Sequence, residues 1–168
     1  MTLSAPAFGE APPAAVAELV SAPRLSGRAQ LAWWGLKVYD ARLWTGPAFS
    51  LRAFAGHPFA LELHYLRGFK GADIAERSLM EMRRAGPLPE AQAARWREAL
   101  QRTLPDAIDR GDRLLGVHRP GRGAAFFHNG KPLGEIVDTE FSARFFGVWL
   151  GPATSEPGLR DALAGGTP

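Results

Sequence analysis

The sequence predicts an α+β domain in which an antiparallel sheet is covered on one face by helices. Segments with the two-residue alternation of β-strands come first, segments with a helical period follow, and a three-strand meander and two more helices come last. A chain of 168 residues fits one domain. We expect this domain to span residues 14–165, after a segment 1–13 that is disordered or the remainder of a targeting signal.

The first half of the domain is expected to consist mainly of strands. Residues 14–20 suit an edge strand or a short helix. Residues 28–44 are rich in aromatic and branched side chains, and they predict two strands or one long strand interrupted at Gly35. A short strand is possible at 50–55. Residues 59–66 alternate apolar and polar side chains, which is typical of a half-buried antiparallel strand.

Helical spacing appears in the middle and at the end of the chain. Asp73 can cap a helix that runs to residue 84, and a second helix begins at Pro89-Glu90 with proline in its first turn. A third, strongly apolar helix is predicted from 138 or 139 to 150, and Ser155 can cap a last short helix.

Between the two helical regions the alternation of strands returns. Residues 112–118, 124–128 and 133–137 predict three strands of a meander, and Asn129-Gly130 is a strong signal for a tight hairpin turn. The order of the elements therefore supports the α+β prediction.

Composition excludes several classes of function. The chain has no cysteine, which removes a thiolate nucleophile, a zinc ribbon and a redox motif. The net charge is +3 with a pI near 9.8, but basic and acidic residues alternate along the chain and no basic run exceeds Arg83-Arg84. Nucleic acid is therefore not expected as a partner. No stretch reaches the ~20 apolar residues of a transmembrane helix.

Catalytic and metal-binding patterns are also missing. The four histidines show no metal-ligand spacing, no serine lies in a nucleophile elbow, and the glycine-rich residues 116–123 lack the lysine of a phosphate-binding loop. The helical carboxylates Glu76 and Glu81 lie five residues apart, and solvation explains them. We therefore expect no metal and no cofactor.

One arginine is unusual in its surroundings. Arg28 follows Gly27 and enters the most apolar strand region of the chain. It could reach solvent from the strand end, or it could point inward and require an anionic partner, because an unpaired buried guanidinium is very costly. Asp40 is the best internal candidate for that partner.

Three segments of the chain resemble the bacterial chalcone isomerase-like proteins. They are Gly27–Trp44 (GRAQLAWWGLKVYDARLW), FFHNGKPLGEI at 126–136, and FFGVWL at 145–150 followed by TSEP. The resemblance covers roughly residues 24–165. It implies the open-faced β-sandwich of chalcone isomerase, a curved antiparallel sheet with helices on one face.

The resemblance also implies roles for single residues. Arg28 matches the arginine that orients the substrate in the isomerase, whereas Tyr39 falls where the enzyme has its threonine. The turn at residues 86–88 replaces the catalytic tyrosine, and Val148 replaces a hydroxyl residue. Arg28 with Tyr39 is more similar to the carboxylate-holding pair of the plant fatty-acid-binding proteins, a second branch of the same fold.

The sequence hypothesis is non-catalytic binding of a small apolar, fatty-acid-like carboxylate in a cleft between sheet and helices, with Arg28 and Tyr39 at its polar end. Because 28 and 39 differ by an odd number, a bulge at Gly35 or a bend near Trp33-Trp34 would have to bring them together. The remaining candidate wall residues are apolar. They are Trp33, Trp34, Leu61, Leu63, Phe127, Phe145 and Val148.

Two other functions remain open at this point. One is an isomerase of the chalcone isomerase type acting on an unsaturated ketone, with Arg28 as its catalytic residue. The other is a pocketless interaction protein in which Arg28 pairs with Asp40. A monomer is favoured, and residues 1–13 favour a periplasmic over a cytoplasmic location.

Overall fold

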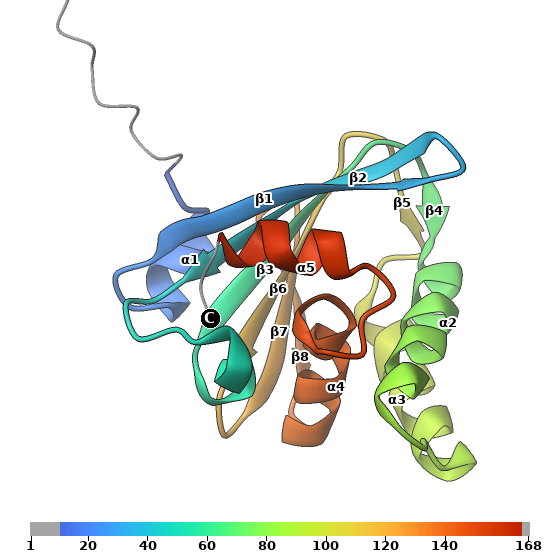
Figure 1. The fold of residues 1–168 in the computed structure, drawn as a ribbon. Coiled ribbons are helices and arrows are strands. Elements are labelled where there is room, and N and C mark those ends of the chain that lie inside the picture. Colours follow the sequence, from blue (N-terminus) through green and yellow to red (C-terminus); the bar gives the residue numbers. More distant parts are fainter. Residues whose placement is uncertain (1–10, 166–168) are drawn as a thin grey trace, which may run out of the picture.

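A six-stranded antiparallel sheet forms the body of the protein, with the strand order β1-β2-β3-β6-β7-β8 (Figure 1). The computed structural model describes residues 11–165. The strands of this sheet are β1 (Arg24–Trp33), β2 (Leu36–Thr45), β3 (Phe59–Tyr65), β6 (Arg113–Arg119), β7 (Gly123–His128) and β8 (Lys131–Ile136). Two short strands, β4 (Phe69–Lys70) and β5 (Ala107–Ile108), pair separately. The predicted α+β class, with a curved antiparallel sheet, is confirmed.

Four helices lie on one side of the sheet: α2 (Gly71–Met82), α3 (Glu90–Thr103), α4 (Thr139–Leu150) and α5 (Pro157–Ala164) (Figure 1). We call the sheet face that meets them the inner face. Of the helices, α5 lies closest to β1, where a Cβ on Gly27 would collide with the backbone carbonyl oxygen of Ala162. Glycine at position 27 therefore allows α5 to pack directly on the strand. Within residues 11–165, no helix is long and apolar enough to cross a bilayer.

The alternation in β3 separates the two faces as the sequence predicts, but the strand is not half-buried, because Ala60 and Glu62 on the outer face are buried as well. Phe59, Leu61, Leu63 and Tyr65 are buried in the core between sheet and helices. Their cross-strand partners on β2 include Leu43 opposite Leu61. Strand alternation therefore places the main core on the inner face.

The opposite face, which we call the outer face, is also partly covered. The short helix α1 (Ala14–Leu19) packs there on a second apolar cluster. The buried members of this cluster are Val16, Val20, Trp44, Ala60, Leu115, Val117 and Ala125. The expectation of helices on a single face thus holds for α2–α5 only. Of the two alternatives for residues 14–20, an edge strand or a short helix, the structure has the helix, at Ala14–Leu19.

Three local predictions differ from the structure. Residues 50–55 are not a strand: Leu51–Gly56 forms a 3₁₀ helix, in which the Ala53 N–H donates to the Ser50 carbonyl. Helix α2 begins at Gly71, so Asp73, the predicted cap, lies in its first turn instead. The last helix has Glu156 at its N-cap, one residue after the predicted Ser155. Helix ends depend on backbone geometry that side-chain type fixes only loosely.

The β1–β2 hairpin contains one extra residue near its tip. The cross-strand pairs are Trp33 with Leu36, Ala32 with Lys37, and then Leu31 with Tyr39, so Val38 has no opposite residue. This bulge shifts the register by one and changes which residues of β2 share a face with β1.

Candidate ligand cavity

A cavity of about 350 Å³ lies between the inner face of the sheet, α2, α4 and the start of α5. This size is near the lower end of the range for small-molecule sites, which is roughly 300–1,000 Å³. Most of the lining is apolar or aromatic. These lining residues are Leu31, Trp33, Val38, Tyr39, Leu63, Tyr65, Phe69, Ile74, Leu104, Leu114, Phe145, Val148, Trp149 and Leu159.

Aromatic side chains from three strands form a continuous wall of the cavity. The rings of Tyr39 and Tyr65 meet edge to face with centroids 5.6 Å apart, and Tyr65 meets Phe69 in the same way at 5.7 Å. Tyr39 lies opposite Tyr65 in the β2–β3 register, which explains the first contact. Edge-to-face packing is a preferred arrangement of aromatic rings, so these contacts stabilise the wall.

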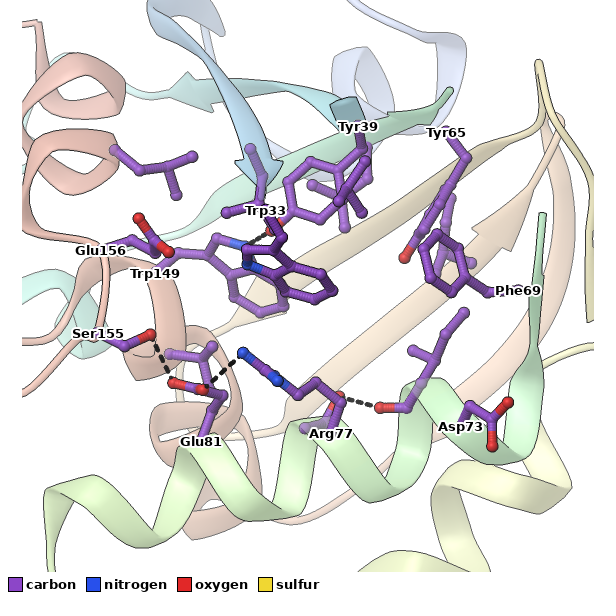
Figure 2. Close-up of a pocket in the computed structure, with 18 of the residues that line it drawn as sticks. Trp33, Tyr39, Tyr65, Phe69, Asp73, Arg77, Glu81, Trp149, Ser155 and Glu156 are labelled. Atoms are coloured by element: carbon purple, nitrogen blue, oxygen red, sulfur yellow. Dashed lines mark hydrogen bonds and ion pairs between the residues drawn. The ribbon is translucent and has the colours of Figure 1, made fainter. Parts of the chain in front are cut away.

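Two tyrosine hydroxyls are the polar atoms of this wall. The Tyr39 hydroxyl oxygen accepts a hydrogen bond of 2.8 Å from Trp149 Nε1, whereas the structure gives the Tyr65 hydroxyl no hydrogen-bond partner among the described residues (Figure 2). Burial raises the pKa of both tyrosines well above the usual value of 10. Both phenols therefore stay protonated, and each can donate to a ligand oxygen.

Charged side chains gather at one end of the cavity. The Arg77 guanidinium lies 4.4 Å from the centre of the Trp33 ring, and its Nη2 is 3.3 Å from Glu81 Oε1 (Figure 2). Glu81 also accepts a hydrogen bond of 2.8 Å from the Ser155 hydroxyl. A chain of contacts thus runs from the β1–β2 hairpin across α2 to the loop before α5, and it fixes the position of the guanidinium.

The charges of the lining are mixed. Arg77 is the one cation among the lining residues, Glu81 and Glu156 are the acids at its end, and the acidic Asp73 lies at the other side, near Phe69 (Figure 2). Glu156 and Glu81 both help to raise the pKa of Tyr39, after desolvation, and Arg77 acts in the opposite direction. Arg77 and Tyr39 both line this cavity. Among residues 11–165, no three metal-ligating side chains form a group that could hold an ion.

Several residues expected from the sequence do line the cavity. They are Tyr39, Trp33, Leu63, Phe145 and Val148.

Arg28 is not among the lining residues. It is exposed, and it lies opposite Arg42 in the β1–β2 register, whereas the cavity residue Tyr39 lies opposite Leu31. Positions 28 and 31 of one strand face opposite sides, so Arg28 projects from the outer face. The expected convergence of Arg28 and Tyr39 on one carboxylate does not fit this geometry. Asp40, also considered as a partner of Arg28, accepts a hydrogen bond of 2.7 Å from Gln30.

Three apolar candidates also lie elsewhere. Trp34 is fully exposed at the tip of the hairpin. Leu61 is on the inner face but is part of the core, not of the cavity lining. Phe127 is on the outer face, packed against the cluster under α1. Strand alternation explains why Phe127 points away from the cavity, because Phe127 pairs with Leu115 and both side chains face α1.

Sequence reasoning missed Arg77, Glu81 and Tyr65. Glu81 was assigned to solvent, yet only 12% of its side chain is exposed. The available signal was spacing: Ile74, Arg77 and Glu81 are three and four residues apart and so share a face of α2 beside its buried stripe. An arginine and an acid at this helical spacing are typical of an ion pair on an exposed surface. The sequence pattern therefore does not indicate that Arg77 and Glu81 line a cavity.

The curved antiparallel sheet, the helices on one face and the apolar cavity between the two layers define an α+β fold with a cavity between its layers. The chalcone isomerase-like family model matches residues 28–165, and the chain belongs to this family. Among solved structures it is similar to a fatty-acid binding protein of Arabidopsis thaliana, AtFAP1, with a TM-score of 0.68 and 10% identity over 86% of this chain and 88% of that chain. At this identity the likeness shows the fold. No curated protein sequence matches the chain significantly.

Proposed function

We propose that the protein binds a fatty-acid-like ligand without transforming it, with the acyl chain in the cavity and the carboxylate at its charged end. The observation that carries the proposal is an apolar cavity of about 350 Å³ whose lining includes the guanidinium of Arg77 and the phenol hydroxyl of Tyr39. The fold shared with a plant protein named as fatty-acid binding supports the same ligand class.

Arg77 takes the role that the sequence hypothesis gave to Arg28. A guanidinium has five N–H donors, and the ion pair with Glu81 joins one nitrogen, Nη2. The other donors can reach a ligand carboxylate, and stacking on Trp33 holds the guanidinium plane in place. The Tyr39 hydroxyl would donate a second hydrogen bond, and the tail would extend along the wall toward Tyr65.

The energy terms favour a moderate affinity. Burial of ten methylenes contributes about 8 kcal/mol at ~0.8 kcal/mol each, and association costs ~4 kcal/mol or more. A charge-assisted contact with Arg77 adds roughly 1.5–3 kcal/mol. The difference corresponds to a Kd of about 10–100 µM. The tail thus supplies most of the affinity, and Arg77 selects the acid.

Calorimetric titration with dodecanoate and with dodecanol tests the proposal. Arg77→Gln is expected to lower the affinity for dodecanoate by roughly tenfold and the affinity for dodecanol by much less. Arg28→Gln is the matched control, because it removes the same charge from the outer face, and it should change neither affinity. No binding of either ligand to the wild type would refute the proposal. A selective loss in Arg28→Gln would restore the sequence hypothesis.

The absence of catalysis is part of the proposal and is tested separately. Because burial raises the pKa of Tyr39, this phenol is a hydrogen-bond donor and not a base at neutral pH. We expect a chalcone to cyclise no faster with the protein than in buffer. Turnover that depends on Tyr39 would overturn this part.

A further inference from the structure

The tip of the β1–β2 hairpin carries a residue that folding alone does not favour. Trp34 and Gly35 form its two-residue turn, with φ angles of +53° and +77°. Positive φ at both positions is typical of a type I′ turn, for which Asn-Gly is the preferred pair. A bulky side chain in this region is strained.

The same chain uses the preferred pair in its other tight turn. Asn129 and Gly130 join β7 to β8 with φ angles of +50° and +83°, nearly the same geometry. At the β1–β2 turn, a tryptophan stands where that asparagine would stand. Its side chain is 100% exposed, so no packing within the described residues offsets the strain. The residue is better explained by a contact outside the chain.

The surroundings of Trp34 indicate what that contact is. Leu36, on the other side of the turn, is 51% exposed, and the hairpin tip projects beyond the body of the sheet (Figure 1). Next to it, Arg67 Nε donates to the Lys37 carbonyl at 3.2 Å, and both side chains are exposed. The segments 31–39 and 66–72 contain three basic residues, Lys37, Arg67 and Lys70, and the nearest acids along the chain, Asp40 and Asp73, come directly after the two segments.

We propose that the hairpin tip docks on an anionic lipid surface, with Trp34 and Leu36 entering the interface. Tryptophan prefers the boundary between headgroups and acyl chains, and nearby cations add attraction to anionic lipids. Trp33, the neighbour of Trp34, lines the cavity and stacks with Arg77. Docking therefore brings the charged end of the cavity to the membrane, where an apolar ligand can pass between the bilayer and the protein without crossing water.

Sedimentation with vesicles tests the docking directly. We expect the wild type to bind vesicles of phosphatidylcholine mixed with phosphatidylglycerol, and to bind far less to phosphatidylcholine alone. Trp34→Asn should lose about tenfold or more of this binding. Val137→Asn is the matched control, because Val137 is also exposed, at 66%, but lies after β8. It should bind like the wild type.

Trp34→Asn also excludes misfolding as a trivial cause. The substitution creates the Asn-Gly turn that the chain already uses at Asn129, so its free energy of unfolding should equal or exceed that of the wild type. Wild-type binding that Trp34→Asn leaves unchanged would overturn the proposal, as would equal binding to neutral vesicles. If the wild type binds no vesicles but self-associates through Trp34, the proposal is also overturned, and the hairpin tip binds a second copy of the chain instead.

The docking and the ligand proposals fail independently. Vesicle binding is measured with lipids free of fatty acid, and dodecanoate affinity is measured without vesicles. If both hold, the rate of fatty-acid transfer from anionic vesicles should rise with vesicle concentration in the wild type and not in Trp34→Asn, while the equilibrium affinity for dodecanoate is the same in both.

Discussion

Glu81→Gln should strengthen the binding of fatty acid. Glu81 competes with a ligand carboxylate for the guanidinium of Arg77, from which it is separated by 3.3 Å. Two unit charges at this distance attract by about 1.3 kcal/mol in water and about 5 kcal/mol at an effective dielectric constant of 20. Because 45% of the Arg77 side chain is exposed, solvent screening reduces the net value to roughly 0.2–1 kcal/mol.

This magnitude predicts a gain of up to about fivefold in dodecanoate affinity, measured by calorimetry. Dodecanol, which carries no charge, should bind Glu81→Gln and wild type equally. The glutamine side-chain oxygen can still accept the hydrogen bond from Ser155, so the loop before α5 keeps its contact. Weaker binding of the acid, or equal changes for acid and alcohol, would refute the assignment of the carboxylate to Arg77.

Three further outcomes can be measured on the free protein. Tyr39→Phe removes the acceptor of the buried Trp149 N–H, so urea denaturation should show a loss of about 1–3 kcal/mol in the free energy of unfolding. Tyr65→Phe should cost far less, because among the described residues its hydroxyl has no partner to lose. Finally, burial lowers the pKa of His118 below its usual 6.5, where Nδ1 is 2.6 Å from Ser142 Oγ. The unfolded chain therefore binds this proton first, so stability should be complete above pH 6.5 and fall by up to ~1.4 kcal/mol per pH unit below it. His118→Gln should flatten that decline, and an unchanged slope would argue against His118 as its source.

The fold could be predicted from the sequence because the apolar residues of its strands and helices recur at regular spacings. In β3 the alternation from Phe59 to Tyr65 identified the buried face correctly, and the Asn129-Gly130 turn marked the β7–β8 hairpin. The 3₁₀ helix at Leu51–Gly56 was missed, because so short a segment carries no period that distinguishes it from a strand.

The residues of the cavity could be predicted from the sequence only in part, for a different reason. Tyr39, which does line the cavity, was expected there from the resemblance to the plant fatty-acid-binding proteins, and Leu63 and Phe145 were expected as apolar wall residues. Arg77 and Glu81 come from a helix that the sequence predicts, but nothing in its helical spacing shows that one side of it faces a cavity. A cavity is the space that packing leaves unfilled, and this depends on how α2, α4 and the sheet come together rather than on any one segment.

The misplacement of Arg28 depends on a single residue. In a regular two-residue hairpin that pairs Trp33 with Leu36, position 39 lies opposite position 30 and shares a face with position 28. The sequence argument asked for a bulge at Gly35 or a bend near Trp33-Trp34 to bring Arg28 and Tyr39 together, and a regular hairpin, the second of these, would have done so. The extra residue Val38 instead places Tyr39 opposite Leu31 and turns its ring to the inner face. Both Val38 and Tyr39 consequently line the cavity. The same bulge that gives the cavity its phenol leaves Arg28 outside, and a guanidinium from the facing helix, that of Arg77, lies in its place.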